Sequence, residues 1–230
     1  EEKSSPDTAP AGTVSCKFWG LGGDGTVGAN KNSIKIIGDH TDKFIQAYFQ
    51  YDSKKTSGIT ISHLRFGDSP IKSSYYINKA NFVACHNSAY LKKYDMISDV
   101  KPGGTFLLDC SWDMAGLEEN LPAKVKATIA KNNIKFITID ATTIATKQIG
   151  NAKVKNTVLQ SAFFSLANIL PKDEAIDYMK KAAYKSYIKK GQAIVDLNYA
   201  AIDAGKDALV KVDVPAAWAN AGETAKAAAA

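Results

Sequence analysis

The sequence lacks the features that define several large classes of protein. It has only three cysteines, Cys16, Cys85 and Cys110, which are widely spaced and form no Cys-x-x-Cys pair. An odd number of cysteines at wide spacing fits neither a disulfide framework nor a zinc or iron–sulfur ligand set, so we interpret the three as reduced, buried thiols. No apolar run approaches the roughly 20 residues that cross a membrane, and the polar N-terminal residues do not resemble a signal peptide. We therefore expect a cytoplasmic protein with no membrane partner.

Concentrated charge and several well-known catalytic motifs are also missing. The net charge of +6 comes from lysines and arginines spread over many segments, whereas nucleic-acid binders gather basic and aromatic residues. We therefore expect no nucleic-acid partner. There is no G-x-S-x-G elbow, no H-E-x-x-H and no P-loop ending. Cys85 and His86 do not read as a nucleophile–base pair, because neighbours on a strand point to opposite faces.

What is present is an alternation of short β-type runs with helical stretches. With 230 residues, 45% of them hydrophobic, the chain can bury the core of one large domain or at most two small ones. The expected strands are 14–19, 44–51, 58–64, 82–85, 105–109 and 134–140. Their rhythm predicts an α/β fold: a mainly parallel, Rossmann-like doubly wound sheet with helices on both faces.

The last third of the chain has a different pattern, which predicts a helical C-terminal part. Apolar residues recur at helical spacing beyond Thr157, and Gly191 and Gly205 are expected to end helices. Residues 1–12 and 213–230 are rich in small and polar residues and resemble linkers. The predicted organisation is therefore a linker at 1–12, a domain at 13–212 and a linker at 213–230 towards a missing following domain.

A glycine-rich turn directly follows the first expected strand. Gly20, Gly22 and Gly25 have the spacing of a dinucleotide-binding turn. Without Cβ atoms such a turn can bring its amides close to a phosphate, and a helix beginning near Thr26 would direct its positive end at the same anion. The residues assigned to this contact are Gly22, Gly23, Asp24, Gly25 and Thr26. The alternative is an ordinary strand-to-helix turn.

The end of the second expected strand is the place where such folds meet a ribose. Here it reads Asp52, Ser53, Lys54 and Lys55. An aspartate alone would suit an unphosphorylated sugar, whereas two lysines with a serine favour a sugar that carries an additional phosphate. Coenzyme A, phosphorylated at the 3′ position, and NADP, phosphorylated at the 2′ position, both fit. The alternative is a solvated charge pair in a turn that connects two strands.

Three further residues are secondary candidates for the same ligand. Asn30, Lys31 and Arg65 are expected to flank the crevice at the carboxyl ends of the strands. His63, on the same predicted strand as Arg65, is as consistent with a hydrogen-bonded structural histidine as with a site residue.

The Gly23-Asp24-Gly25 segment also matches the start of a thiamine-diphosphate motif, in which the aspartate binds magnesium. That motif continues to an Asn-Asn pair one helix downstream, and the pair here, Asn132 and Asn133, lies much further along the chain. We therefore predict that this chain binds neither thiamine diphosphate nor a metal.

Residues 16–35 resemble the gamma-type domain of pyruvate:ferredoxin (or flavodoxin) oxidoreductase. The resemblance continues through most of the chain, and its other motifs lie at 51–55, 61–67, 83–87, 102–106 and 160–164. It implies an enzyme that decarboxylates pyruvate on thiamine diphosphate, passes electrons through iron–sulfur clusters to ferredoxin or flavodoxin, and transfers the acetyl group to coenzyme A.

The resemblance also implies a division of labour. In the family this domain is associated with coenzyme A, which favours coenzyme A over NADP for the turn and the lysine pair. Thiamine diphosphate, magnesium and the 4Fe–4S clusters are expected in other domains of the same polypeptide, because this chain has no cluster motif. The full enzyme is expected to be a homodimer, and this domain is expected to be inactive alone. The remaining alternatives are a purely structural domain of that enzyme and an NADP-binding oxidoreductase module.

Overall fold

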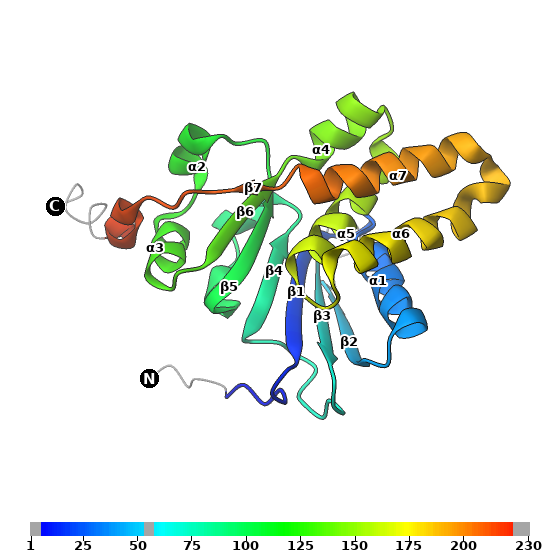
Figure 1. The fold of residues 1–230 in the computed structure, drawn as a ribbon. Coiled ribbons are helices and arrows are strands. Elements are labelled where there is room, and N and C mark those ends of the chain that lie inside the picture. Colours follow the sequence, from blue (N-terminus) through cyan, green and yellow to red (C-terminus); the bar gives the residue numbers. More distant parts are fainter. Residues whose placement is uncertain (1–5, 53–57, 223–230) are drawn as a thin grey trace.

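A seven-stranded sheet forms the centre of the computed structural model, which describes residues 6–52 and 58–222 (Figure 1). The strands, in chain order, are β1 (Val14–Leu21), β2 (Phe44–Tyr51), β3 (Ile59–Gly67), β4 (Ala80–Cys85), β5 (Val100–Asp109), β6 (Lys135–Ile139) and β7 (Val210–Lys211). Their order across the sheet is β2-β3-β1-β4-β5-β6-β7. All six strands expected from the sequence are present, and the two-residue β7 is an addition.

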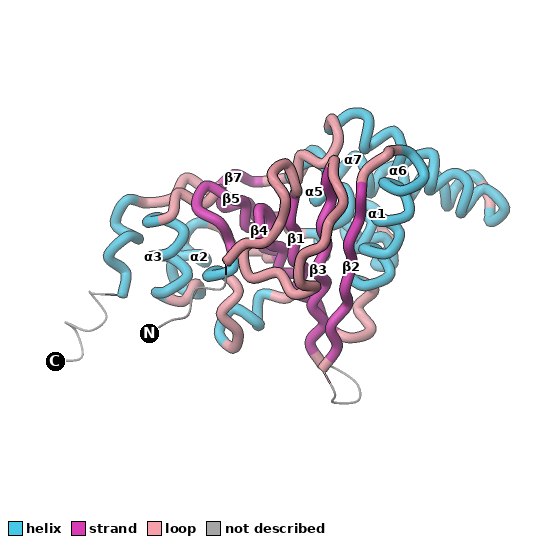
Figure 2. Tube along the Cα trace, turned by 90° about the horizontal axis from the view of Figure 1, so that it is seen from below, coloured by secondary structure: helices cyan, strands magenta, loops and turns pink. Residues whose placement is uncertain are grey.

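Most strands of the sheet point the same way, which confirms the predicted fold class. β1, β4, β5 and β6 are parallel neighbours, while β3 is antiparallel to both β1 and β2, and β7 is antiparallel to β6. The crossover from β1 through a helix to β2 leaves room for one strand between β1 and β2. β3 occupies this position, because it folds back from β2 as a hairpin. This hairpin extends past the rest of the sheet in Figure 2.

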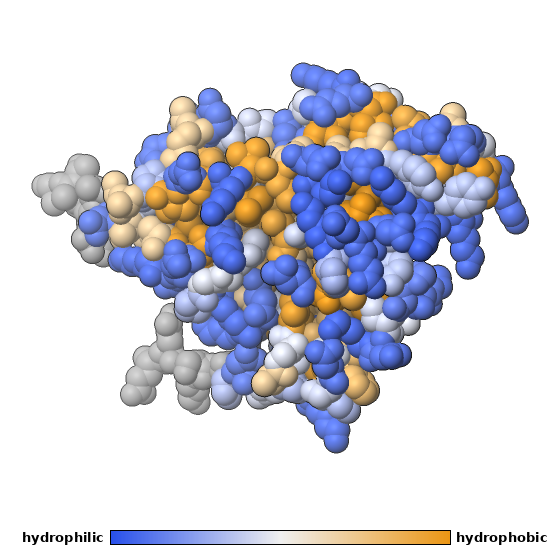
Figure 3. Space-filling model, viewed as in Figure 1, coloured by the Kyte–Doolittle hydropathy of each residue, from blue (hydrophilic) through white to orange (hydrophobic). Residues whose placement is uncertain are grey.

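Helices cover both faces of the sheet, as expected. They are α1 (Thr26–His40), α2 (Met114–Asn120), α3 (Ala123–Lys131), the short α4 (Ala141–Thr143), α5 (Lys155–Leu166), α6 (Lys172–Tyr187) and α7 (Gln192–Asp207). α1 and α5 lie on one face with α6 and α7 packed over them, and α2 and α3 lie on the other (Figure 1). The exposed sides of α6 and α7 are largely hydrophilic (Figure 3).

The alternation of side chains along the strands divides the core into two clusters. Phe18 belongs to the cluster under α1 and α5, where its ring centroid lies 5.0 Å from that of Phe163. Trp19, the next residue, belongs to the cluster under α3. Neighbouring residues on a strand face opposite sides, so a stretch that is buried on both faces is apolar, as residues 82–85 of β4 and 106–108 of β5 are.

Of the two glycines expected to end helices, only Gly191 does so. Its φ of +108° lies in the region that favours glycine, and it separates the α6 segment from α7. Gly205 lies inside α7 instead, where a Cβ would collide with the backbone oxygen of Val158 in α5. Gly205 therefore allows α7 to pack closely on α5 and does not end the helix. The sequence could not distinguish the two roles, because both glycines fit the same pattern.

The described parts of both expected linkers contact the domain. Near the N-terminus, Asp7 pairs with Lys101 at 2.7 Å. Near the C-terminus, Trp218 is only 2% exposed and donates a hydrogen bond of 2.5 Å from Nε1 to Glu118. The packed structure therefore extends to at least Trp218, beyond the expected boundary at residue 212. None of the described helices is long and apolar enough to cross a lipid bilayer.

Candidate functional site

The glycine-rich turn joins β1 to α1, and close contacts or backbone conformation require glycine at four of its positions. A Cβ on Gly20 would lie 2.7 Å from the Thr26 hydroxyl, and a Cβ on Gly22 would lie 3.0 Å from the Gly58 carbonyl oxygen. Gly23 and Gly25 have φ values of +87° and +88°, which other residues adopt only with strain. The helix begins at Thr26, as predicted.

Asp24 holds this turn in shape through both oxygens of its carboxylate. Oδ2 accepts a hydrogen bond from the Leu21 amide at 2.8 Å, and Oδ1 accepts one from the Thr26 amide at 2.7 Å. From the α5 side, Asn156 donates a hydrogen bond of 2.6 Å to the Asp24 carbonyl oxygen. The Asp24 carboxylate therefore already lies at the positive end of α1, where it stabilises the conformation of the turn.

Three of the five turn amides that were predicted to hold a phosphate already donate within the chain. Gly22 donates to the Gly58 carbonyl, Asp24 to the Leu21 carbonyl and Thr26 to its neighbouring carboxylate. Gly23 and Gly25 are exposed, and Gly25 lies beside Asn156 of α5. An anion at this turn would therefore be held by the amides of Gly23 and Gly25.

The β2–β3 hairpin brings the second predicted contact to the same edge of the sheet. Leu21 pairs with Ile59, and the Gly22 amide donates a 2.7 Å hydrogen bond to the Gly58 carbonyl. Asp52 donates its amide to the Ile59 carbonyl at 3.0 Å. Both flanks of the basic segment thus lie beside the glycine turn. The segment itself, Ser53, Lys54 and Lys55, lies outside the described residues.

The three secondary candidates have different positions. Lys31 is exposed on α1, with its Nζ 5.4 Å from the ring centroid of Phe49 in β2. Asn30 is 3% exposed, and its Nδ2 has no hydrogen-bond partner among the described residues; it lies beneath α1 and not on the crevice. Of these two, Lys31 is the one available to a ligand at this edge.

Arg65 lies at the opposite end of the sheet. It pairs with Ser15, near the start of β1, because β3 runs antiparallel to β1. Its guanidinium donates to Gln46 Oε1 at 2.6 Å and to the carbonyl oxygens of Ser74 and Tyr76. The expectation that Arg65 flanks the crevice assumed a parallel strand, and the hairpin reverses its direction. Its observed role is to fix the loop before β4.

The crevice at the carboxyl ends of β1, β4, β5 and β6 is acidic. It has a volume of about 490 Å³, and its charged lining consists of Asp24, Asp109, Asp140 and Lys155. Burial raises the pKa of Asp109, and the neighbouring Lys155, 3.1 Å away, opposes that rise. The sequence analysis assigned Asp24 to the turn but missed Asp109 and Asp140, although each is the last residue of an expected strand. Their charge makes the crevice unfavourable for phosphate groups.

His86 also lines the acidic crevice. Its Nδ1 lies 3.0 Å from the Thr26 hydroxyl, which connects the end of β4 to the first turn of α1. Burial lowers the pKa of His86 to about 4. Its imidazole is therefore neutral at pH 7 and adds no positive charge to the crevice.

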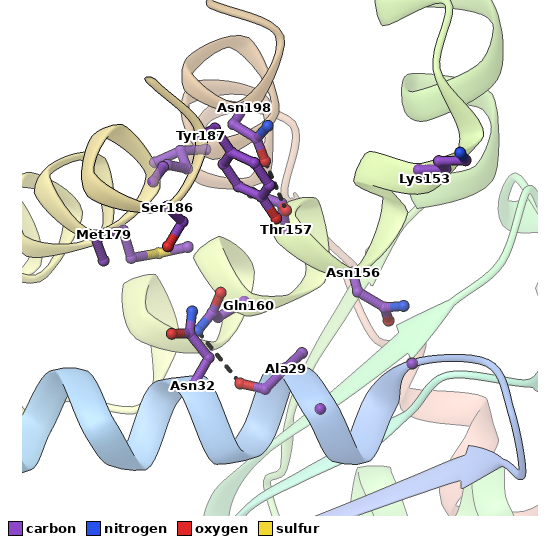
Figure 4. Close-up of a pocket in the computed structure, with 15 residues that line it drawn as sticks. Ala29, Asn32, Lys153, Asn156, Thr157, Gln160, Met179, Ser186, Tyr187 and Asn198 are labelled. Atoms are coloured by element: carbon purple, nitrogen blue, oxygen red, sulfur yellow. Dashed lines mark hydrogen bonds between the residues drawn. The ribbon is translucent and has the colours of Figure 1, made fainter. Parts of the chain in front are cut away.

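A second pocket lies between α1, α5, α6 and α7 (Figure 4). Its volume is about 290 Å³, and most of its polar lining consists of amide and hydroxyl side chains. Gln160 donates to the Ser33 hydroxyl at 2.9 Å, and the Thr157 hydroxyl donates to Asn198 at 3.4 Å. These hydrogen bonds join neighbouring helices, so the amide side chains in this pocket have a structural role in helix packing.

The cysteines and acidic residues do not form a metal site in the described part of the chain. Within residues 6–52 and 58–222, no group of three or more His, Cys, Asp or Glu side chains is placed to hold a metal ion. Cys16 and Cys85 are buried and Cys110 is partly buried. Burial raises the pKa of all three thiols, to about 12 for Cys85 and about 11 for Cys110, so all three remain thiols at pH 7.

Acidification is expected to destabilise the fold through its buried histidines. His63 accepts the Ile77 amide at Nδ1 at 3.0 Å, and burial lowers its pKa from 6.5 to about 3. Between these values the unfolded chain binds more protons than the folded one, so the free energy of unfolding decreases as the pH falls below 6.5, by up to about 1.4 kcal/mol per pH unit for one group. Urea unfolding between pH 7 and 4.5 measures this slope. His63→Gln should flatten it, and an unchanged slope would contradict the assignment.

Comparisons with known proteins assign the chain to a family. Residues 15–208 match the family described as pyruvate ferredoxin/flavodoxin oxidoreductase. Pyruvate:ferredoxin oxidoreductase of Moorella thermoacetica is 52% identical over 227 residues, which are 99% of this chain but 19% of that protein. The chain thus spans about a fifth of the length of this curated relative.

Two solved structures share the fold at low sequence identity. A pyruvate oxidoreductase subunit from Thermotoga maritima has a TM-score of 0.67 at 18% identity, over 86% of this chain and 98% of that one. A 2-oxoglutarate:ferredoxin oxidoreductase from Magnetococcus marinus, solved with 2-oxoglutarate, coenzyme A and succinyl-CoA, has a TM-score of 0.63 at 18% identity, over 89% of this chain and 32% of that one. These two structures show the fold, and the family match over residues 15–208 with the 52% identity to the Moorella protein shows that the chain belongs to the pyruvate ferredoxin/flavodoxin oxidoreductase family.

Proposed function

We propose that this chain is the coenzyme A-binding domain of an enzyme that oxidatively decarboxylates pyruvate. The full enzyme would transfer the acetyl group to coenzyme A and pass the electrons to ferredoxin or flavodoxin. Support comes from the relative named pyruvate:ferredoxin oxidoreductase and from the structural neighbour solved with coenzyme A. The other domains of the polypeptide, the electron acceptor and a second copy of the full enzyme are the expected partners.

One observation carries the assignment of the ligand site to this domain. The pairing of Leu21 with Ile59 and the hydrogen bond from Gly22 to Gly58 join the glycine turn to the hairpin end. The turn, in which Gly23 and Gly25 are exposed, and the described flanks of the two-lysine segment therefore lie at one edge of the sheet. Coenzyme A carries a diphosphate and a separate 3′-phosphate, so it requires two such anion contacts close together.

Each contact has a distinct role in the proposed complex. The amides of Gly23 and Gly25, with the positive end of α1, bind the diphosphate. Ser53, Lys54 and Lys55 bind the 3′-phosphate by charge-assisted hydrogen bonds. Lys31 adds positive charge on the adjoining side of α1.

The charge distribution favours phosphate binding on the hairpin side of the turn over binding in the crevice. Asp24, Asp109 and Asp140 all line the crevice, and their carboxylates would repel phosphate. On the hairpin side, Gly23 is exposed next to Gly22, whose amide bonds to Gly58, and Lys31 of α1 lies against Phe49 of β2. We therefore place the phosphates of the ligand on the hairpin side of the turn.

The chemical step belongs to other domains in this proposal. Asp24 does not fit a magnesium–thiamine diphosphate site, because both of its carboxylate oxygens accept amide hydrogen bonds within the chain. The contribution of this domain to the rate would be to bind coenzyme A and position its thiol. Thiamine diphosphate, magnesium and iron–sulfur clusters are assigned to the rest of the polypeptide.

Protection against thermal unfolding tests the identity of the ligand. A ligand present at 100 times its Kd stabilises the folded state by about 2.7 kcal/mol, which raises the Tm of a domain of this size by roughly 5–10 °C. We expect coenzyme A to produce this shift at low salt and NADP to produce less than a third of it. A larger shift with NADP would support an NADP module, and no shift with either ligand would favour a structural domain.

A further inference from the structure

An exposed aromatic side chain stands at the carboxyl end of β2, beside the proposed phosphate contacts. Tyr51 is the last residue of this strand and is 60% exposed. We propose that Tyr51 is the platform on which the adenine ring of the ligand stacks, which makes it a residue that determines specificity. This inference rests on the proposed function, because it assumes a ligand that carries both phosphates and a purine.

The strand pattern places Tyr51 on the same face of the sheet as α1. Ile45, Ala47 and Phe49 pack against the core cluster under α1. Side chains two residues apart share a face of a strand, so Tyr51 continues this row. Tyr48, one residue out of phase, instead has its ring beside those of His63 and Tyr76 on the opposite face.

Tyr51 lies at the end of β2, towards the edge of the sheet at which α1 begins. The Lys31 side chain reaches Phe49, since its Nζ is 5.4 Å from that ring centroid. Two residues further along β2 is a rise of about 6.6 Å, and four residues back along α1, to Val27, is about 6 Å. Since α1 begins at the edge of the sheet where β2 ends, both steps lead towards that same edge. The exposed ring therefore lies on the α1 face of β2, towards the edge of the sheet at which α1 begins.

The chemistry of this position fits a purine nucleotide better than a simple anion. An exposed tyrosine offers an aromatic face, and stacking of a base on such a face contributes about 1–3 kcal/mol. The neighbouring Lys31 and the exposed Gly23 supply positive charge and an amide for phosphate groups. A ligand that fills both parts has an aromatic ring joined to phosphates through a sugar.

The test compares two probes that separate base recognition from phosphate recognition. Adenosine 3′,5′-bisphosphate carries the purine and phosphates, whereas inorganic pyrophosphate carries phosphates alone. By calorimetry on this chain, Tyr51→Ala is expected to weaken binding of the bisphosphate about tenfold and to leave pyrophosphate affinity unchanged. Tyr51→Phe should remain within about twofold of the wild type, because it keeps the aromatic face.

Tyr75→Ala is the matched control, because Tyr75 is also 60% exposed but its ring neighbours Tyr48, on the other face of the sheet. It should leave both affinities unchanged. Equal affinity of Tyr51→Ala and wild type for the bisphosphate would overturn the stacking inference and leave the proposed function standing. Failure of the wild type to bind the bisphosphate and coenzyme A would overturn the proposed function, and the inference with it.

Discussion

Replacing both Lys54 and Lys55 by alanine is expected to weaken binding of coenzyme A by about 10- to 100-fold. Hydrogen bonds to a charged group contribute about 1.5–3 kcal/mol each, and solvent screening at an exposed site reduces that value. Affinity for 3′-dephospho-coenzyme A should change by less than threefold, because that ligand lacks the phosphate these lysines are proposed to bind. Calorimetry at low salt measures both affinities, since screening weakens such contacts as salt rises.

The matched control removes the same charge elsewhere. Lys189 and Lys190 lie in the short helical turn that follows α6, and both are exposed. Their double replacement by alanine should leave coenzyme A affinity unchanged. If the two double variants weaken binding equally, the lysines act only through net charge. If Lys54→Ala plus Lys55→Ala has no effect, the assignment of the 3′-phosphate is incorrect.

Gly205→Ala is expected to destabilise the fold by about 3 kcal/mol, the upper end of the range for overpacking. A Cβ at this position would collide with the Val158 carbonyl oxygen and would lie 2.7 Å from Cβ of Ser161. The carbonyl is backbone, so α7 must move away from α5, whose buried residues form the centre of the larger core cluster. Urea unfolding should show the decrease in the free energy of unfolding, with a Tm lower by roughly 6–12 °C.

Gly38→Ala provides a comparison within a helix that tolerates the change. A Cβ there would have only an ordinary contact of 3.7 Å with Ile45, so the higher helix propensity of alanine should stabilise the fold by up to about 1 kcal/mol. The two substitutions are chemically identical and are expected to have opposite signs. Destabilisation of equal size would mean that both results reflect a general intolerance of alanine and not the α5–α7 contact.

The strands and the first helix could be predicted because local pattern and tertiary environment agree. β4 and β6 are apolar runs flanked by polar residues, and α1 begins directly after a glycine turn. The direction of β3 could not be read in the same way, since alternation in 59–67 is the same for a parallel and an antiparallel strand. The position of Arg65 depended on that direction and was therefore wrong.

The candidate site was predictable in its residue types but not in its electrostatics. The glycine spacing indicates a turn with accessible amides, but only the structure shows that Asp24 engages Leu21 and Thr26 and that the Gly22 amide is already paired. The acidic crevice arises from residues after three different strands. Sequence distance conceals such clusters, because they form when the strands align in the sheet.

A backbone amide titration with coenzyme A, followed by nuclear magnetic resonance of this chain, tests the central claim most directly, because it locates the ligand residue by residue. The account predicts that the largest shifts are at Gly23 and Gly25, with smaller ones at Val27, Lys31 and Gly58. Shifts centred on Asp109 and Asp140, or no shifts at millimolar coenzyme A, would contradict it.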